Sequence, residues 1–425
     1  MSIDRNLTRR TFLRASAVGL GAAALASPVR RSTAAAEGGT LQVYWNAGHA
    51  YDGYKQVIAQ FEQDHPGWKV NLQLFQWPDM RTKILADFAA GNPPDLMEEP
   101  GGWVQDFATA GTIRSLQPYV DQDGEAMGFP SDWQPYAVER DTFSGEVYGI
   151  QLHLTCALLF YNKDMFSQAG IAEPPKTWEE FVAAAKATSK GNVFGFAPNQ
   201  SADYAWYWLF QNDVGIYDPE KNVVPMDNDA AYEAMQFQAD LIHKDKVAPI
   251  PIAAADYEGP QKLFSAQRAA MIVTGPWDIK PILDGSPDLN WGIAQASTHK
   301  VQATFSAGTS MMIPKDAKQP DLAWDLIKRL TNPDVELAVT KEANQTMPRK
   351  SWGDLPEVKA LERVAPFTQG LTYARDLYAG LRLTGHFGEI NDLFTKAYQD
   401  ILYRNLAASD VLKDFAEQSN KILAG

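Results

Sequence analysis

Residues 146–162, EVYGIQLHLTCALLFYN, are a long apolar run near the first third of a 425-residue chain. We interpret the run as two strands joined in line, which is how a chain crosses from one lobe to another. The chain is 45% hydrophobic, enough for more than one compact core of ordinary size. Two lobes or domains are therefore the default expectation.

The segments before this run alternate between strand and helix patterns. Residues 40–46 (TLQVYWN) and 69–75 (KVNLQLF) alternate apolar and polar side chains, as half-buried strands do. Residues 54–68 and 79–95 have apolar residues at helical spacing, and each segment ends in a Pro-Gly or Gly-Asn-Pro-Pro signal. This order predicts an α/β fold built on open, mostly parallel sheets covered by helices.

Two later segments carry local signals. Residues 176–189 (KTWEEFVAAAKATS) predict a helix that begins with a capping box between Thr177 and Glu180. Residues 268–277 (RAAMIVTGPW) predict a buried strand that ends at Gly-Pro and then presents Trp277.

The first 36 residues have the composition of an export signal. A charged head with Arg9 and Arg10 in TRRTFLR precedes a short apolar stretch and the small residues Ala34–Ala36, so we expect cleavage after Ala36. An ordinary secretory signal is the alternative to a twin-arginine signal. Both predict a mature protein outside the cytoplasm, in the periplasm.

The mature chain would be strongly acidic. Removing six Arg and one Asp gives (38 − 6) − (52 − 1) = −19, a charge that disfavours nucleic acid as a partner. The single cysteine, Cys156, is far from any processing site, so we expect it to be buried and the protein not to be lipid-anchored.

The usual signatures of enzymes and metal sites are missing from the sequence. The six histidines form no pair at the spacing of local zinc motifs, and no G-x-S-x-G elbow occurs, so we expect no metal, no cofactor and no enzyme. Two facing carboxylates of a glycosidase remain possible, because sequence cannot place them.

Tryptophans give the more informative signal. Trp45, Trp103 and Trp277 each follow a predicted strand, and ligands of open α/β sheets bind at such ends. An indole there can stack on the C–H face of a sugar ring, although each one alone is more often a core residue.

Several stretches together resemble one family, the extracellular solute-binding proteins of family 1, which are maltose-binding-protein-like receptors of ABC importers. The most specific are LLFYNKDMF followed by PPKTWEEF, and then AAMIVTGPW; others are FAAGNPPDLMEEPGGW and FSAGTSMMIP. The resemblance runs from about residue 40 to 340.

The resemblance implies a two-lobed periplasmic binding protein fold with three inter-lobe crossings, near Leu152-His153, Gly275–Trp277 and Ile313–Lys315. It implies an N-terminal lobe of residues 37–152 plus 277–313 and a C-terminal lobe of residues 153–276 plus 314–425. The ligand-binding residues it implies are Asn46, Trp103, Tyr204, Trp206, Trp277, Gly308, Arg349 and His386.

The expected function is capture of a carbohydrate, an oligosaccharide or a glycoside, and its delivery to a membrane permease. The expected protein is a monomer. Two alternatives stay open at this point: an exported carbohydrate-active hydrolase and a receptor for glycerol-phosphate-type solutes.

Overall fold

The computed structural model describes residues 38–251 and 259–425. The export signal and its cleavage site lie outside these ranges. Contacts group the described residues into one compact unit that contains two separate main sheets.

The large sheet has the strand order β11-β10-β3-β1-β2, and β6 pairs with β10 as well. Strands β1, β2 and β3 are parallel, whereas β10 runs antiparallel to β3 and β6. The strands are β1 (Gly39–Asn46), β2 (Trp68–Phe75), β3 (Leu96–Glu99), β6 (Ile150–Cys156), β10 (Thr304–Met312) and β11 (Ala374–Asp376).

Helices cover both faces of this sheet. Successive side chains of β1 point to opposite sides of the sheet and pack on different helices. Leu41 and Val43 share a buried cluster with Phe61 of α1 and Ile327 of α12, whereas Tyr44 packs with residues of α2. The helices of this large-sheet lobe are α1 (Asp52–Asp64), α2 (Trp77–Ala90), α3 (Val104–Thr109), α4 (Gln117–Met127), α5 (Pro135–Arg140), α12 (Pro320–Leu330), α13 (Pro333–Ala343) and α14 (Pro356–Lys359), with the 3₁₀ turns η1 (Ala47–His49) and η4 (Ser351–Asp354) and the hairpin β4 (Thr142–Phe143) and β5 (Glu146–Val147).

The small sheet is antiparallel, with β7 between β8 and β9. Its strands are β7 (Leu158–Asn162), β8 (Met271–Thr274) and β9 (Trp291–Ala294). The other helices form the small-sheet lobe: α6 (Lys163–Gln168), α7 (Trp178–Thr188), α8 (Trp206–Gln211), α9 (Asp229–His243), α10 (Gly259–Ser265), α11 (Ile279–Gly285), α15 (Ala365–Gly370), α16 (Phe387–Leu402) and α17 (Ala408–Ala424), with η2 (Ala202–Ala205), η3 (Pro276–Asp278) and η5 (Leu381–Thr384).

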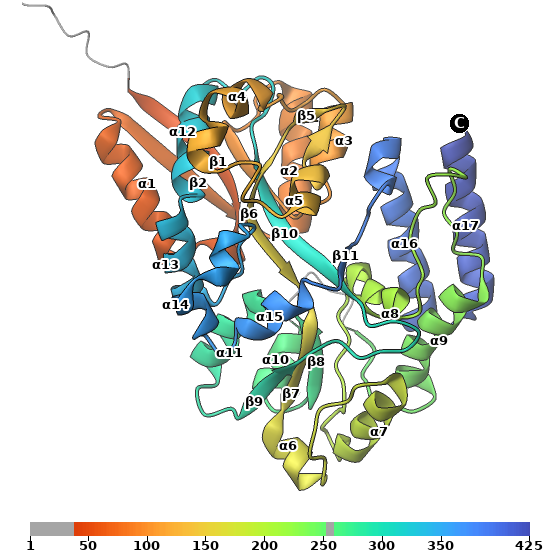
Figure 1. Cartoon of the computed structure of the whole chain (residues 1–425). Helices are drawn as coiled ribbons and strands as arrows, with labels where there is room; N and C mark the ends of the chain where they lie inside the picture. The colour runs from red at the N-terminus through yellow and green to blue at the C-terminus, as the bar shows by residue number, and fades with distance from the viewer. Residues whose placement is uncertain (1–37, 252–258) are drawn as a thin grey trace, which may run out of the picture. The chain divides into compact units, whose positions relative to one another are not determined.

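The local expectations for residues 146–162 and 176–189 are confirmed. The apolar run forms β6 and β7 in line, one in each sheet, as Figure 1 shows. Thr177 caps α7 by accepting a hydrogen bond from the backbone N–H of Glu180, and Cys156 is fully buried. The chain therefore passes from one sheet to the other at Ala157, a few residues after the expected Leu152-His153.

The strand pairings differ from the expected boundaries after residue 276. Gly275 directly follows β8 of the small sheet, but η3 and α11 then return the chain to β9, which pairs with β7. Residues 277–294 thus stay in the small-sheet lobe, and the second crossing is made by β10. Residues 313–315 are not a crossing, because the helices that follow them, α12 and α13, pack on α1 of the large-sheet lobe. The chain returns to the small-sheet lobe near β11, which pairs with β10. Gly-Pro and Ile-Pro mark strand ends in the sequence, but only the pairing partners show where the chain goes next.

Arg349 lies inside the large-sheet lobe and is 5% exposed. Its guanidinium stacks 3.9 Å from the ring centre of Trp133, donates to the carbonyls of Met127 and Thr331, each at 2.7 Å, and pairs with Glu336 at 3.2 Å. Burial raises the pKa of Glu336 to about 8, against the opposing charge of Arg349. These contacts give Arg349 a bracing role.

Replacing Arg349 by Ala leaves two buried carbonyls and a carboxyl group without their donor. We expect Arg349→Ala to lower the free energy of unfolding by about 2–4 kcal/mol, since each buried acceptor left without a donor costs about 1–3 kcal/mol. Urea unfolding measures this change. The neighbouring exposed Lys350 provides the control, since Lys350→Ala should change stability by no more than about 0.5 kcal/mol. Equal stabilities of the two variants would contradict the bracing role.

Candidate functional site

A cavity of about 150 Å³ lies where loops of the large-sheet lobe face η5 and α16 of the small-sheet lobe. Its lining combines three arginines, three aspartates and several aromatic rings. From the large-sheet lobe and the crossing strand come Arg81, Pro100, Gly101, Gly102, Trp103, Arg140, Ser306 and Ala307; from the other side come Asp203, Asp376, Leu377, Tyr378, Arg382, Phe387, Gly388, Asn391 and Asp392.

The loop after β3 presents Trp103 to this cavity. The buried carboxylate of Glu99, at the end of β3, accepts a hydrogen bond of 2.9 Å from the backbone N–H of Trp103, which fixes the Pro-Gly-Gly turn. Gly101 has a φ of 95°, and a Cβ there would lie 2.3 Å from Nη1 of Arg140. The glycine therefore lets the guanidinium reach the cavity wall. Trp103 is 7% exposed and packs edge-on against Trp77, with 6.0 Å between ring centres.

Arg140 is buried with two acids that balance its charge. Its Nη2 donates to Oγ of Ser310 at 2.7 Å, its Nε lies 3.4 Å from Asp141, and its Nη2 lies 3.7 Å from Glu99. Burial raises the pKa of both Glu99 and Asp141, and the nearby guanidinium opposes this rise. The cluster thus holds a cation on the wall without exposing a net positive charge.

A second pair lies at the cavity between η5 and the end of β11. Arg382 donates to both carboxylate oxygens of Asp376, one of them at 2.6 Å. Burial raises the pKa of Asp376, but the charge and hydrogen bonds of Arg382 outweigh burial and lower it below 3.8. The hydroxyl of Tyr378 donates to Asp203, a half-buried carboxylate whose pKa is raised by desolvation.

Helix α16 approaches the large-sheet lobe closely at Gly388. A Cβ there would lie 3.0 Å from Nη2 of Arg81 and 3.4 Å from Oδ2 of Asp106. Arg81 and Asp106 are themselves paired at 3.6 Å. Both lobes thus contribute to the cavity wall, so a molecule in the cavity would contact both.

The chemistry of this wall is binding chemistry. Aspartate and asparagine oxygens accept hydrogen bonds and arginines donate them, which suits hydroxyl groups that do both. Three arginines and three aspartates line the cavity, and the aromatic rings offer apolar faces.

The structure brings only part of the expected ligand-binding set to this cavity. Trp103 lines it, and Gly308 lies in β10 two residues from the lining residue Ser306. The other expected residues do not line the cavity. Asn46 donates its N–H to Glu98 at 2.9 Å, and Arg349 braces the large-sheet lobe. Tyr204 packs edge-on to Phe305, Trp206 is fully buried against Phe210 and Phe394, and Trp277 is partly buried on the same core, while His386 precedes the lining residue Phe387.

Gly308 has a structural reason to be glycine. A Cβ at this position would lie 2.3 Å from the carbonyl oxygen of His153, so the close approach of β10 and β6 requires its absence.

Sequence reasoning missed most of the polar lining. Asp203 directly precedes Tyr204, and Asn391 and Asp392 follow His386 on α16. Both Tyr204 and His386 were among the implied ligand-binding residues, so the sequence pointed to the neighbours of these lining residues. Arg81, Arg140 and Arg382 gave no local signal, because an arginine beside an acidic residue in the sequence is common and does not show which arginines face a cavity.

A sequence model of the bacterial extracellular solute-binding proteins matches residues 47–336, more than half of the chain. The chain belongs to this family. Among curated relatives, this solute-binding protein is 25% identical over 378 residues to a putative binding protein of Brucella abortus, which covers 87% of this chain and 89% of the relative. It is 24% identical over 401 residues to the galactooligosaccharide-binding protein of Bacillus subtilis, which covers 91% and 89%.

Solved structures show the same two-lobed fold. The GacH receptor of Streptomyces glaucescens GLA.O, solved unliganded and in complex with acarbose, matches with a TM-score of 0.82 and 22% identity, over 91% of this chain and 99% of that one. Within the described ranges, none of the helices of this solute-binding protein combines the length and apolar character needed to cross a bilayer.

Asp106 makes the cavity wall sensitive to pH. Burial raises the pKa of Asp106 from 3.8 to about 6, against the charges of Arg81 and Arg382. Between these values the folded state holds a proton that the unfolded state has lost, so stability falls as the pH rises from about 4 to about 6. We expect Asp106→Asn to flatten this part of the stability curve, measured by urea unfolding across the range.

The exposed Asp121 supplies the control for the loss of one charge. Asp121→Asn should keep the wild-type slope. If Asp106→Asn also kept it, the raised pKa of Asp106 would be refuted.

Proposed function

We propose that this protein is the substrate-binding component of an ABC importer and captures an uncharged carbohydrate, an oligosaccharide or a glycoside, between its two lobes. The observation that carries the proposal is the cavity wall, where Trp103 stands beside arginine–aspartate pairs whose charges cancel. A sugar offers apolar ring faces to the indole and hydroxyl groups to the paired acids and bases. The named relatives that bind a galactooligosaccharide or acarbose support this class of ligand.

The mechanism is lobe closure coupled to binding. A sugar that touches Trp103 on one lobe and Asn391 on the other interacts more strongly with the closed arrangement, so it shifts the population toward that state. The closed state is then the one that the membrane permease recognises. We propose that the protein performs no catalysis and acts as a monomer.

The twin-arginine pattern of residues 8–14 supports export to the periplasm, and the central, buried Cys156 argues against a lipid anchor. The excess of acidic residues makes nucleic acid an unsuitable partner.

An anionic solute such as a glycerol phosphate ester is the second candidate, because three arginines line the cavity. Each of these arginines is already paired with an acid: Arg81 with Asp106, Arg140 with Asp141, and Arg382 with Asp376. A phosphate would have to compete with these carboxylates, which favours the neutral sugar.

The ligand class can be identified by thermal shift, since a ligand that binds only the folded state raises the melting temperature. We expect neutral oligosaccharides or glycosides to raise it and glycerol phosphate esters to leave it unchanged. The opposite pattern would favour the second candidate.

With the sugar identified, calorimetry tests the contribution of Trp103. We expect Trp103→Ala to weaken binding by about 2 kcal/mol, as loss of a buried aromatic anchor does, and Trp103→Phe to retain part of the affinity. Trp68→Ala, on β2 and outside the cavity lining, is the matched control and should bind normally. Unchanged affinity of Trp103→Ala would refute the site.

Incubation of the sugar with the protein separates a receptor from a hydrolase. We expect chromatography to recover the sugar unchanged after prolonged incubation. Accumulation of shorter products that disappears with Asp203→Asn or Asp392→Asn would instead show a carbohydrate-active enzyme with cleft carboxylates.

A further inference from the structure

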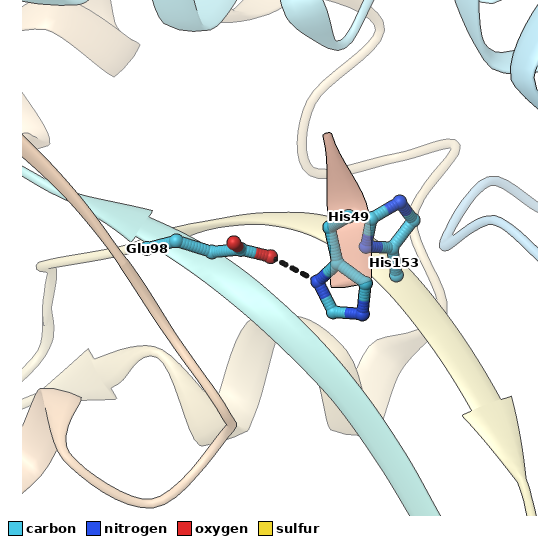
Figure 2. A group of neighbouring side chains, drawn as sticks. All are labelled: His49, Glu98 and His153. Carbon is cyan, nitrogen blue, oxygen red and sulfur yellow. Dashed lines mark hydrogen bonds and ion pairs between the residues drawn. The ribbon is translucent and has the colours of Figure 1, made fainter. Parts of the chain in front are cut away.

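Three metal-ligating side chains from distant parts of the sequence meet beside the large sheet. His49 comes from η1 after β1, Glu98 from β3, and His153 from β6, and Figure 2 shows the two imidazole rings and the carboxylate converging. Each residue offers one ligand atom, and these atoms all lie within 4.8 Å of one another. Among the described residues, no other three His, Cys, Asp or Glu side chains bring their ligand atoms this close together.

The group is buried and contains a carboxylate in need of a positive partner. Glu98 has no exposed surface, His153 is 2% exposed, and the side chain of His49 is 12% exposed. Oε2 of Glu98 accepts the backbone N–H of Asn46 at 2.9 Å, and Oε1 lies 2.7 Å from Nδ1 of His49. Among the described residues, Glu98 has His49 as its ion-pair partner, and His49 can supply at most one positive charge. Buried carboxylates are stable when paired or when they coordinate a metal.

Neighbouring hydroxyl groups hold His153 in place. Its Nε2 lies 2.8 Å from the hydroxyl of Tyr54, and its Nδ1 lies 2.9 Å from Oγ1 of Thr309. Each contact occupies one ring nitrogen, so binding of an ion by His153 would break one of the two, while the other nitrogen keeps donating to its hydroxyl. Outer contacts of this kind set the tautomer and orientation of histidine ligands.

We propose that His49, Glu98 and His153 form a binding site for a divalent transition-metal ion, with Zn²⁺ as the best-fitting ion. Two imidazole nitrogens and one carboxylate oxygen are the donor set of three-ligand zinc sites, which keep a fourth position for water or another ligand. Zinc–nitrogen bonds are about 2.0–2.1 Å long, so the ligand atoms of a tetrahedral site lie about 3.4 Å apart. The ligand atoms, which now lie within 4.8 Å of one another, would have to approach to this separation when the ion binds.

The site is separate from the sugar cavity but connected to it through aromatic contacts. The ring of His49 packs on Trp77 at 5.8 Å, and Trp77 packs on Trp103 of the cavity wall. An ion would tie the loop after β1 to β6, the strand that continues into the small sheet. The proposal stands independently of the sugar-binding function, because no residue of the ion site lines the cavity.

The ion site is tested on the mature chain, without an affinity tag and after treatment with a chelator. Calorimetric titration with ZnCl₂ should show one equivalent bound per chain. We expect His49→Ala and Glu98→Gln to weaken Zn²⁺ binding by at least about 100-fold, since each removes one of three ligands. His65→Ala is the matched control: His65 also pairs with an acid, Asp325 at 3.0 Å, but on the surface, and its loss should leave the affinity unchanged.

A proton on Nδ1 of His49 would satisfy Glu98 without any metal, and the titration separates the two cases. Absence of stoichiometric Zn²⁺ binding, or binding equal to wild type in both ligand variants, would overturn the proposal. Circular dichroism of the metal-free variants checks that they are folded. If a variant does not fold, X-ray absorption of the zinc-loaded wild type decides: two imidazoles in the coordination shell support the site, and their absence overturns it.

Discussion

The antiparallel pairing of β6 with β10 is the constraint on which the rest of the structure depends. Gly308 brings the two backbones together where any side chain would collide with the carbonyl of His153. The register then shifts between Thr309 and Ser310, leaving Leu152 of β6 unpaired. Such a bulge re-aims neighbouring side chains. It places Ser310 on the guanidinium of Arg140 at the cavity wall, while Thr309 contacts His153. One strand pair thus connects the two sheets, the cavity and the histidine cluster.

Buried charge is handled by pairing throughout this molecule. Arg140 with Asp141, Arg382 with Asp376 and Arg349 with Glu336 each combine a guanidinium with a buried carboxyl group. The first two pairs lie at the cavity, where they provide donors and acceptors in fixed positions without a net charge. A cavity of this kind suits a neutral, hydroxyl-rich ligand, because the protein has already matched its own charges. The third pair uses the same chemistry only for stability.

Patterns of short range were reliable guides to this protein. The alternation in residues 40–46, the apolar run from 146 to 162 and the capping residues Thr177 and Glu180 all form the predicted elements, because each depends on neighbours within one strand or one turn. Trp206, expected to line the ligand site, is fully buried instead, with its ring packed on Phe210 and Phe394. Whether an aromatic residue lies in a core or on a cavity wall depends on the elements that pack against it, which spacing does not show.

The same distinction applies to the whole protein. The sequence by itself determined the alternation of strands and helices and the position of Trp103 after β3, because these follow from local periodicity and from turn residues. Its motifs, such as LLFYNKDMF and AAMIVTGPW, carried the resemblance to a two-lobed family. Only the tertiary structure decided the lobe to which residues 277–294 belong, the pairing of Arg81 with Asp106, and the meeting of His49, Glu98 and His153. The histidines were judged by their spacing along the chain, and a cluster built from three separate elements has no such spacing. Strand pairing brings its members together, and that pairing is a property of the folded chain.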